Sequence, residues 1–136
     1  MAAAVRQETP DALILVDSVS GLGAVPFRMD DWGVDLVVTG SQKAWMAAPG
    51  LAMIAASERG WAAMETARMP RFYLDLQAHR EAAANGQTPF TPAIAVVYQV
   101  DEGLRLMAAE GADNVFARHE ACAAAARAGL VALGFE

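Results

Sequence analysis

The chain has 136 residues, of which 55% are hydrophobic and 19% charged, and its formal net charge is −6. This length corresponds to one domain of ordinary size, and the composition predicts a packed core rather than a disordered chain. Its 10 basic residues are scattered. This excludes the basic stripe that nucleic-acid binding requires, so we expect no nucleic-acid partner.

Cysteine usage and hydropathy indicate where the protein resides. Cys122 is the single cysteine, which excludes an internal disulfide and a multi-cysteine zinc site and is typical of a reducing compartment. No stretch approaches the roughly 18 to 20 apolar residues that cross a bilayer, and the N-terminus lacks the pattern of a signal peptide. We therefore expect a cytoplasmic protein with no membrane partner.

Three short apolar runs predict strands. The first, ALILV at residues 12–16, is continuously apolar, as in a parallel strand that is buried on both faces. The second and third are residues 34–40 and 51–57, and Asp30 is a candidate N-cap for a helical turn before the second. Roughly ten residues link the last two runs, too few for a parallel crossover, so we predict that they pair antiparallel.

The second half of the chain predicts helices. A short helix is expected near residues 59–67, followed by a long loop that ends near residue 90. From Thr91 onward, apolar residues recur at spacings of three and four up to Gly111, and a further helix is expected over 112–128. The residues expected on the buried faces are Ala93, Val97, Val100, Leu104 and Met107, then Val115, His119, Cys122 and Ala126.

Asp17 and Lys43 are the first candidates for chemistry. Asp17 follows the first predicted strand, and Lys43 follows the second within an otherwise apolar segment. Ligands of open α/β sheets bind outside the carboxyl ends of the strands, so both side chains can face one site. Dry surroundings favour a neutral amine that attacks an aldehyde, and a carboxylate can keep a pyridine nitrogen protonated. The structural alternative is a lysine that reaches to water and an aspartate that caps a turn.

Residues 16–52, VDSVSGLGAVPFRMDDWGVDLVVTGSQKAWMAAPGLA, resemble the core of class V pyridoxal-phosphate aminotransferases, especially the alanine-glyoxylate and serine-glyoxylate branch. Residues 88–98, TPFTPAIAVVY, are similar to the segment whose hydroxyls reach the cofactor phosphate of the neighbouring subunit in the family's homodimer. The resemblance implies pyridoxal 5′-phosphate as cofactor. It implies Lys43 as the Schiff-base lysine and, as cofactor-binding residues, Asp17 at the ring nitrogen, Val19 on the ring, Gln42 at the phosphate, and Thr91 and Thr88 across the dimer.

The resemblance also implies a fold and a reaction. Residues 1–110 would be the last strands of a mostly parallel α/β sheet in a fold-type I large domain, its final strand antiparallel. Long helices would lead into a small C-terminal domain that starts within residues 111–136. The implied reaction transfers an amino group from alanine or serine to glyoxylate or pyruvate.

The family's enzymes are much longer than this chain, so we expect a fragment that is weakly stable and does not turn over alone. An unpaired edge of the first strand would contribute to that weakness. Two alternatives stay open, namely a lyase or desulfurase of the same family and a non-catalytic truncated remnant. Gly21, Trp45 and Ala48 depart from the family pattern, which leaves the amino donor and acceptor open.

Other patterns carry weaker signals. The glycines at 21–24 are followed by Pro26 where a dinucleotide fingerprint needs its third glycine. His79 and His119 lack metal-ligand spacing, and capping and solvation account for the aspartates, so we expect no metal site. The aspartates explained by capping and solvation are Asp30, Asp31 and Asp35, and the residues interpreted as packing are Trp61, Met64, Met69 and Cys122.

Overall fold

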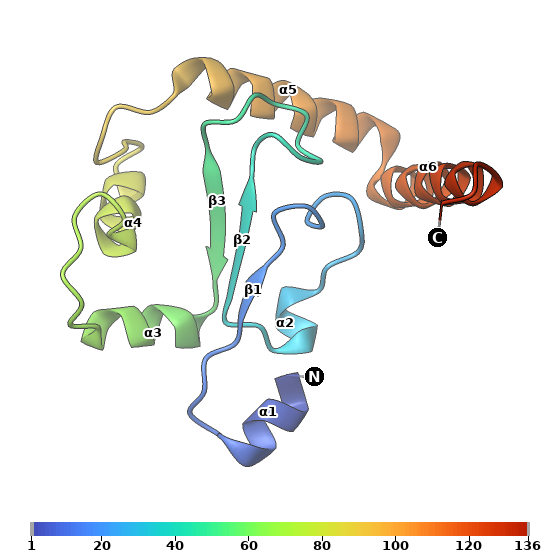
Figure 1. The fold of residues 1–136 in the computed structure, drawn as a ribbon. Coiled ribbons are helices and arrows are strands. Elements are labelled where there is room, and N and C mark those ends of the chain that lie inside the picture. Colours follow the sequence, from blue (N-terminus) through green and yellow to red (C-terminus); the bar gives the residue numbers. More distant parts are fainter. Residues whose placement is uncertain (1, 136) are drawn as a thin grey trace.

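A computed structural model describes residues 2–135 and contains one three-stranded sheet (Figure 1). The strands lie in the order β1 (Leu15–Asp17), β2 (Leu36–Gly40) and β3 (Ala52–Ala56). β1 pairs parallel with β2, and β2 pairs antiparallel with β3. The predicted antiparallel pairing is therefore confirmed, because the short connection between β2 and β3 forces the chain to reverse.

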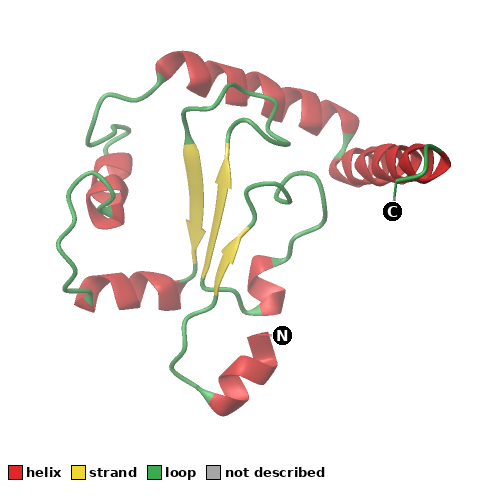
Figure 2. Cartoon of the chain, in the orientation of Figure 1, coloured by secondary structure: helices red, strands yellow, loops and turns green. Residues whose placement is uncertain are grey.

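Helices surround the sheet on several sides (Figure 2). α5 crosses the end of the sheet at which β1 and β2 finish, while α3 and α4 lie beside β3 and α6 extends away from the sheet (Figure 1). The helices are α1 (Ala2–Glu8), α2 (Met29–Trp32), α3 (Glu58–Thr66), α4 (Leu76–Ala84), α5 (Ile94–Glu110) and α6 (Ala112–Ala132).

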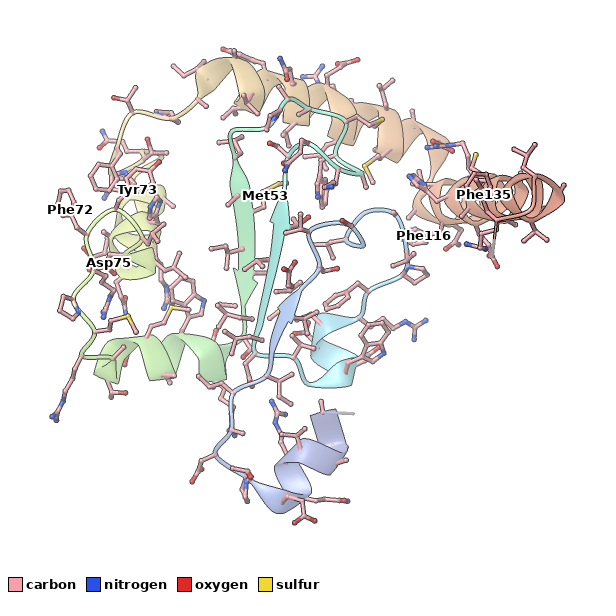
Figure 3. All side chains as sticks on the ribbon, viewed as in Figure 1. Met53, Phe72, Tyr73, Asp75, Phe116 and Phe135 are labelled. Atoms are coloured by element: carbon pink, nitrogen blue, oxygen red, sulfur yellow. The ribbon has the colours of Figure 1, made fainter. Side chains whose placement is uncertain are left out.

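The long loop predicted after residue 67 is wrong, because it contains α4. Asp75 caps this helix by accepting a hydrogen bond from the Gln77 amide at 3.0 Å, and Arg71 lies 3.2 Å from the same carboxylate. The cap starts a helix that the weak apolar periodicity of the segment did not reveal. Figure 3 shows Phe72, Tyr73 and Asp75 together in the bend that precedes α4.

The first strand is shorter and more exposed than predicted. β1 begins at Leu15, and the Leu15 side chain is 65% exposed. Among residues 2–135, β1 pairs with β2 alone, so no strand pairs with its other edge. Leu15 and Asp17 point to the same face of β1 and both are exposed, so the prediction of burial on both faces is wrong, although the predicted parallel pairing is present.

The predicted buried face of α5 is only partly correct. Val100 is buried and Met107 is half-buried, but Val97 and Leu104 are 44% and 45% exposed. The buried stripe instead runs through Val100 and Gly103. The reason is that α5 packs against the loop after β2, and that loop decides which side of the helix is covered.

In α6, burial is confined to the first turns. Val115 is buried and His119 is half-buried, with its Nδ1 2.8 Å from the Val115 carbonyl. Cys122 and Ala126 are exposed, so the prediction that they belong to the core is wrong. The helix projects beyond the sheet (Figure 1), and nothing in residues 2–135 covers its later turns.

Of the residues predicted to pack in and after α3, two are half-buried and one is exposed. Trp61 and Met64 are half-buried, and the Arg80 guanidinium lies 4.7 Å from the centre of the Trp61 ring. Met69 is 79% exposed, so its assignment to packing is wrong. It follows α3 in the bend before α4, where the chain runs over the surface.

Asp35 is buried at the end of the sheet opposite the carboxyl ends of β1 and β2. Its carboxylate is 2% exposed and lies 2.9 Å from Nη2 of Arg6, and it accepts hydrogen bonds from the Ile14 amide at 2.8 Å and the Ser57 hydroxyl at 3.2 Å. Burial acts to raise the pKa of Asp35, but the Ile14 amide and Arg6 outweigh it and hold the pKa below its ordinary value. The expectation that solvation explains Asp35 is wrong.

Asp30 and Asp31, by contrast, are exposed in α2. Asp30 lies inside the first turn of α2 and is not its N-cap, which is Arg28. Negative charge in the first turn of a helix is favourable because it faces the unpaired amides there.

Candidate active site

Asp17 and Lys43 lie at the carboxyl edge of the sheet, that is, the end at which the parallel strands β1 and β2 finish. Asp17 is the last residue of β1, and Lys43 follows Gly40, the last residue of β2, by three positions. β1 and β2 run parallel as neighbouring strands, with Asp17 level with Val38, two residues before β2 ends. The predicted acid and amine therefore lie at the same end of the sheet, and Figure 1 shows that α5 crosses this end.

The Asp17 carboxylate is partly committed to its own turn. Its Oδ1 accepts a hydrogen bond from the Val19 amide at 3.0 Å, which is the capping role that the structural alternative proposed. Within residues 2–135, Oδ2 accepts no hydrogen bond, and the side chain is exposed. One oxygen thus orients the carboxylate and the other is open to a ligand.

The Lys43 side chain is exposed, and the prediction that it lies in dry, apolar surroundings is wrong. Its sequence neighbours Ala44 and Trp45 turn inward against Gly23, while Lys43 faces outward. Residues adjacent in sequence are not adjacent in space once the loop turns. No residue among 2–135 forms a hydrogen bond or ion pair with the Lys43 amine, which leaves Nζ open to a ligand.

Ser41 closes the loop that carries Lys43. The residue is fully buried, and its hydroxyl donates to the Ala48 carbonyl at 2.7 Å and accepts from the Leu51 amide at 3.2 Å. The Ser41 amide also donates to the Leu51 carbonyl at 3.1 Å. These bonds join the two ends of the loop over residues 41–51, so the position of Lys43 depends on Ser41. Sequence reasoning missed it, although a serine directly after a buried strand is a usable signal.

α5 supports the same loop from above. Oε1 of Gln99 accepts a hydrogen bond from the Ala48 amide at 2.7 Å. Gly103 packs so closely on the Trp45 carbonyl oxygen that a Cβ atom at this position would clash with it. Met46 adopts a positive φ of 60°, which is uncommon for a residue with a side chain and marks a tightly held turn.

The other predicted residues of this edge are Val19 and Gln42. Val19 is half-buried in the turn after β1. The Gln42 side chain is exposed and folds over Gly40, where a Cβ atom would be 2.8 Å from its Oε1. The structure thus places both residues on the two loops that bear Asp17 and Lys43.

Thr88 and Thr91 lie elsewhere in this chain. Both line a cavity of about 780 Å³ between β3, α3, α4 and the segment before α5, and the described lining contains neither Asp17 nor Lys43. The Thr88 hydroxyl donates to the Phe90 carbonyl at 2.7 Å, and Thr91 is exposed. Within residues 2–135, neither hydroxyl forms a hydrogen bond with Lys43 or lines a cavity together with it.

Residues 2–135 contain no group of three or more His, Cys, Asp or Glu residues arranged to hold a metal ion. No helix in this range combines the length and apolar character needed to cross a membrane.

Comparison with known proteins places this geometry in context. Residues 1–135 match the family model described as aminotransferase class-V. A protein of Synechococcus sp. named soluble hydrogenase, small subunit, is 46% identical over 122 residues, covering 90% of this chain and 32% of the relative. The L-aspartate–glyoxylate aminotransferase of Paracoccus denitrificans is 42% identical over 125 residues, covering 92% of this chain and 32% of the relative.

A solved structure gives the same picture. The pyridoxamine-pyruvate aminotransferase from Mesorhizobium loti superposes with a TM-score of 0.84 and 35% sequence identity, covering 98% of this chain and 34% of that one. The chain therefore spans about a third of the length of the curated relatives and the solved structure that it matches.

Proposed function

The chain belongs to the class-V aminotransferase family, and we propose that it is the part of a pyridoxal-phosphate-dependent transaminase that holds the cofactor's aldehyde and ring nitrogen. Its mixed α/β fold is that of part of a fold-type I enzyme. The observation that carries the proposal is the placement of Asp17 and Lys43 on one edge, at the ends of two parallel strands.

The donor set of this edge fits pyridoxal 5′-phosphate. The cofactor presents an aldehyde, a pyridine nitrogen and a phosphate, and the edge presents an unpaired amine, a carboxylate with one free oxygen, and an amide. When bound, the cofactor supplies the electron sink for bond breaking at the amino acid's Cα. Lys43 would hold the aldehyde, Asp17 the ring nitrogen and Gln42 the phosphate.

Each residue of the edge has a separate task. Oδ2 of Asp17 would accept a hydrogen bond from the protonated ring nitrogen, and the Val19 amide on Oδ1 keeps the carboxylate facing that way. Nζ of Lys43 would take the proton from the substrate's Cα as a general base and deliver it to the cofactor's C4′ carbon as a general acid. The Val19 side chain would pack on the ring face.

The reaction that we propose moves an amino group from a small amino acid, alanine or serine, to glyoxylate or pyruvate. Glyoxylate appears in the name of the Paracoccus relative and pyruvate in that of the Mesorhizobium structure, which supports this class of acceptor. We further propose that residues 1–110 belong to the large domain and 111–136 begin a small one, in a cytoplasmic homodimer. There Thr91, and Thr88 beside it, would reach the partner's cofactor phosphate, since both are remote from the site of their own chain.

Lys43 is the only lysine in the chain, which makes the test direct. Pyridoxal 5′-phosphate is added, borohydride reduces the adduct, and mass spectrometry of the digested protein locates it. We expect the adduct on Lys43 in the natural chain and its loss from that position in Lys43→Arg, which keeps the charge but not the amine. An adduct confined to the N-terminal amine would refute the proposal.

A second measurement tests the expectation that this chain alone does not turn over. Alanine or serine is supplied with glyoxylate or pyruvate, and the product amino acid is measured. We expect no product from the isolated chain, because it spans about a third of its relatives. Cofactor-dependent product formation would show this expectation to be wrong while supporting the transaminase assignment.

A further inference from the structure

One buried hydroxyl connects the two loops of the candidate site. Thr39, in β2, is 2% exposed, and its Oγ1 accepts a hydrogen bond from the indole Nε1 of Trp45 at 3.1 Å. The same hydroxyl donates to the Val19 carbonyl at 3.4 Å, which is long for such a bond, so the contact with Trp45 is the stronger one. Thr39 thus joins the loop after β1 to the loop after β2.

A packing contact links the same two loops independently. Gly23 has a positive φ of 90°, and a Cβ atom there would lie 3.2 Å from Cβ of Ala44 and 3.6 Å from Cε2 of Trp45. The indole therefore rests against the backbone of the loop after β1. It also lines an apolar cavity of about 430 Å³ together with Met107 and Phe116. Figure 3 shows Phe116 at the start of α6, beside that loop.

The residues joined by these contacts lie close in sequence to the two candidate catalytic residues, Asp17 and Lys43. Val19 follows Asp17 by two residues, and Trp45 follows Lys43 by two residues. A bridge from the Val19 carbonyl through Thr39 to Trp45 therefore fixes the two short segments that bear the acid and the amine. We propose that Thr39 and Trp45 form a clamp that sets the position of Lys43 relative to Asp17, as positioning residues that do not themselves touch the cofactor.

This inference rests on the proposed function, and it concerns a feature particular to this chain. Trp45 stands where leucine is common in the class V family, and a leucine side chain has no N–H group that could donate a hydrogen bond to Thr39. A small displacement of a reacting group lowers its reactivity strongly, because productive geometry requires a close approach of the reacting atoms. The clamp would hold that approach without contributing an atom to the reaction.

The test uses the full 136-residue chain and three variants. Thr39→Val removes the hydroxyl at nearly constant shape, Thr39→Ser keeps it, and Trp45→Phe keeps a ring but removes the N–H. Thr66→Val and Trp61→Phe make the same chemical changes in α3 and serve as matched controls. Thermal melts are recorded for all of them. If Thr39→Val fails to fold, Trp45→Phe carries the test.

The first readout is the ratio of reduced pyridoxal adduct on Lys43 to that on the N-terminal amine of the same molecule. This ratio corrects for differences in protein amount and labelling, and the thermal melts of the variants and of the two controls report general destabilisation. We expect Thr39→Val and Trp45→Phe each to lower it roughly three- to tenfold, as the loss of one net hydrogen bond implies. A chain that carries both substitutions should be no worse than Thr39→Val alone, because Thr39→Val already removes the bond that Trp45→Phe removes. Thr39→Ser should restore the natural ratio.

The second readout does not require the cofactor. Hydrogen exchange of the Trp45 indole N–H is followed by NMR, with the 48% exposed Trp32 as the unprotected reference. We expect protection in the natural chain and in Thr39→Ser, and its loss in Thr39→Val. If Lys43 traps no cofactor but Trp45 is protected in this pattern, the proposed function fails and the clamp stands. An unchanged adduct ratio in folded Thr39→Val and Trp45→Phe, or a Trp45 indole that exchanges as fast as Trp32, would overturn the clamp.

Discussion

Arg6 and Asp35 form an ion pair between α1 and the start of β2, with Nη2 and Oδ2 2.9 Å apart and the carboxylate 2% exposed. This pair ties the N-terminal helix to the sheet, and Arg59 from α3 approaches the same carboxylate at 3.7 Å. A buried charge thus anchors the end of the sheet that is remote from the candidate active site.

Replacing Asp35 should therefore destabilise the fold. Asp35→Asn leaves Arg6 without its countercharge, and breaking a buried pair on one side costs about 3–5 kcal/mol. Urea unfolding followed by circular dichroism measures the loss. Asp31→Asn is the matched control, because Asp31 is 67% exposed and 3.6 Å from Arg28, and its pair contributes about 1 kcal/mol or less. Equal stability of the two variants would contradict the anchoring role.

The same carboxylate predicts a pH dependence. The pKa of Asp35 is lower in the folded chain than its ordinary value of 3.8, so the folded state binds this proton less readily than the unfolded state. Its contribution to stability is therefore complete above that ordinary value and is lost as the pH falls through the lower folded pKa. Unfolding free energies measured between neutral pH and about pH 3 should fall more steeply in the natural chain than in Asp35→Asn.

Part of that acid dependence should survive in Asp35→Asn. The pKa of Glu110 is also below its ordinary value, mainly because Arg118 donates hydrogen bonds to this carboxylate. Glu110 therefore also loses its contribution to stability as the pH falls. Parallel pH profiles in the natural chain and the variant would refute the assignment to Asp35.

Two glycine substitutions should act in opposite directions. Gly103→Ala introduces a Cβ atom against the Trp45 carbonyl oxygen, which forces α5 away from the Lys43 loop at a cost of about 1–3 kcal/mol. Gly129→Ala in α6 meets nothing within 4 Å and should stabilise the helix by about 0.5–1 kcal/mol. Thermal melts of both variants measure the difference. A neutral effect of Gly103→Ala would show that α5 does not press on the loop.

Removing the Ser41 hydroxyl should loosen the loop that carries Lys43. Ser41→Ala removes the hydrogen bonds to the Ala48 carbonyl and from the Leu51 amide, and each lost bond costs about 0.5–1.5 kcal/mol. We expect a lower melting temperature and faster amide exchange over residues 42–50. Ser20→Ala changes an exposed serine and should alter neither quantity. Unchanged exchange in Ser41→Ala would mean that other contacts close the loop.

Several features of the fold follow from short stretches of sequence. The three strands, their antiparallel final pair and the helix after Gly111 were predictable, because apolar runs, connection length and a chain-breaking glycine act locally. α4 was not, because its main signal is the cap at Asp75 rather than an apolar stripe.

For the candidate site too, one feature was predictable from the sequence and another was not. That Asp17 and Lys43 follow consecutive parallel strands was predictable from their positions after two apolar runs. The outward direction of Lys43 was not, because it depends on how residues 41–51 fold back beneath α5.

By itself, then, the sequence determined the order of the three strands and which chemical groups follow each of them, since these depend on neighbours along the chain. Only the tertiary structure decided which of those groups are buried. Asp35 became a buried anchor through Arg6, 29 positions away, and Thr39 became a bridge between two loops because it also reaches Val19, 20 positions away. Burial and hydrogen bonding of this kind arise when remote segments meet, and no local pattern specifies that meeting.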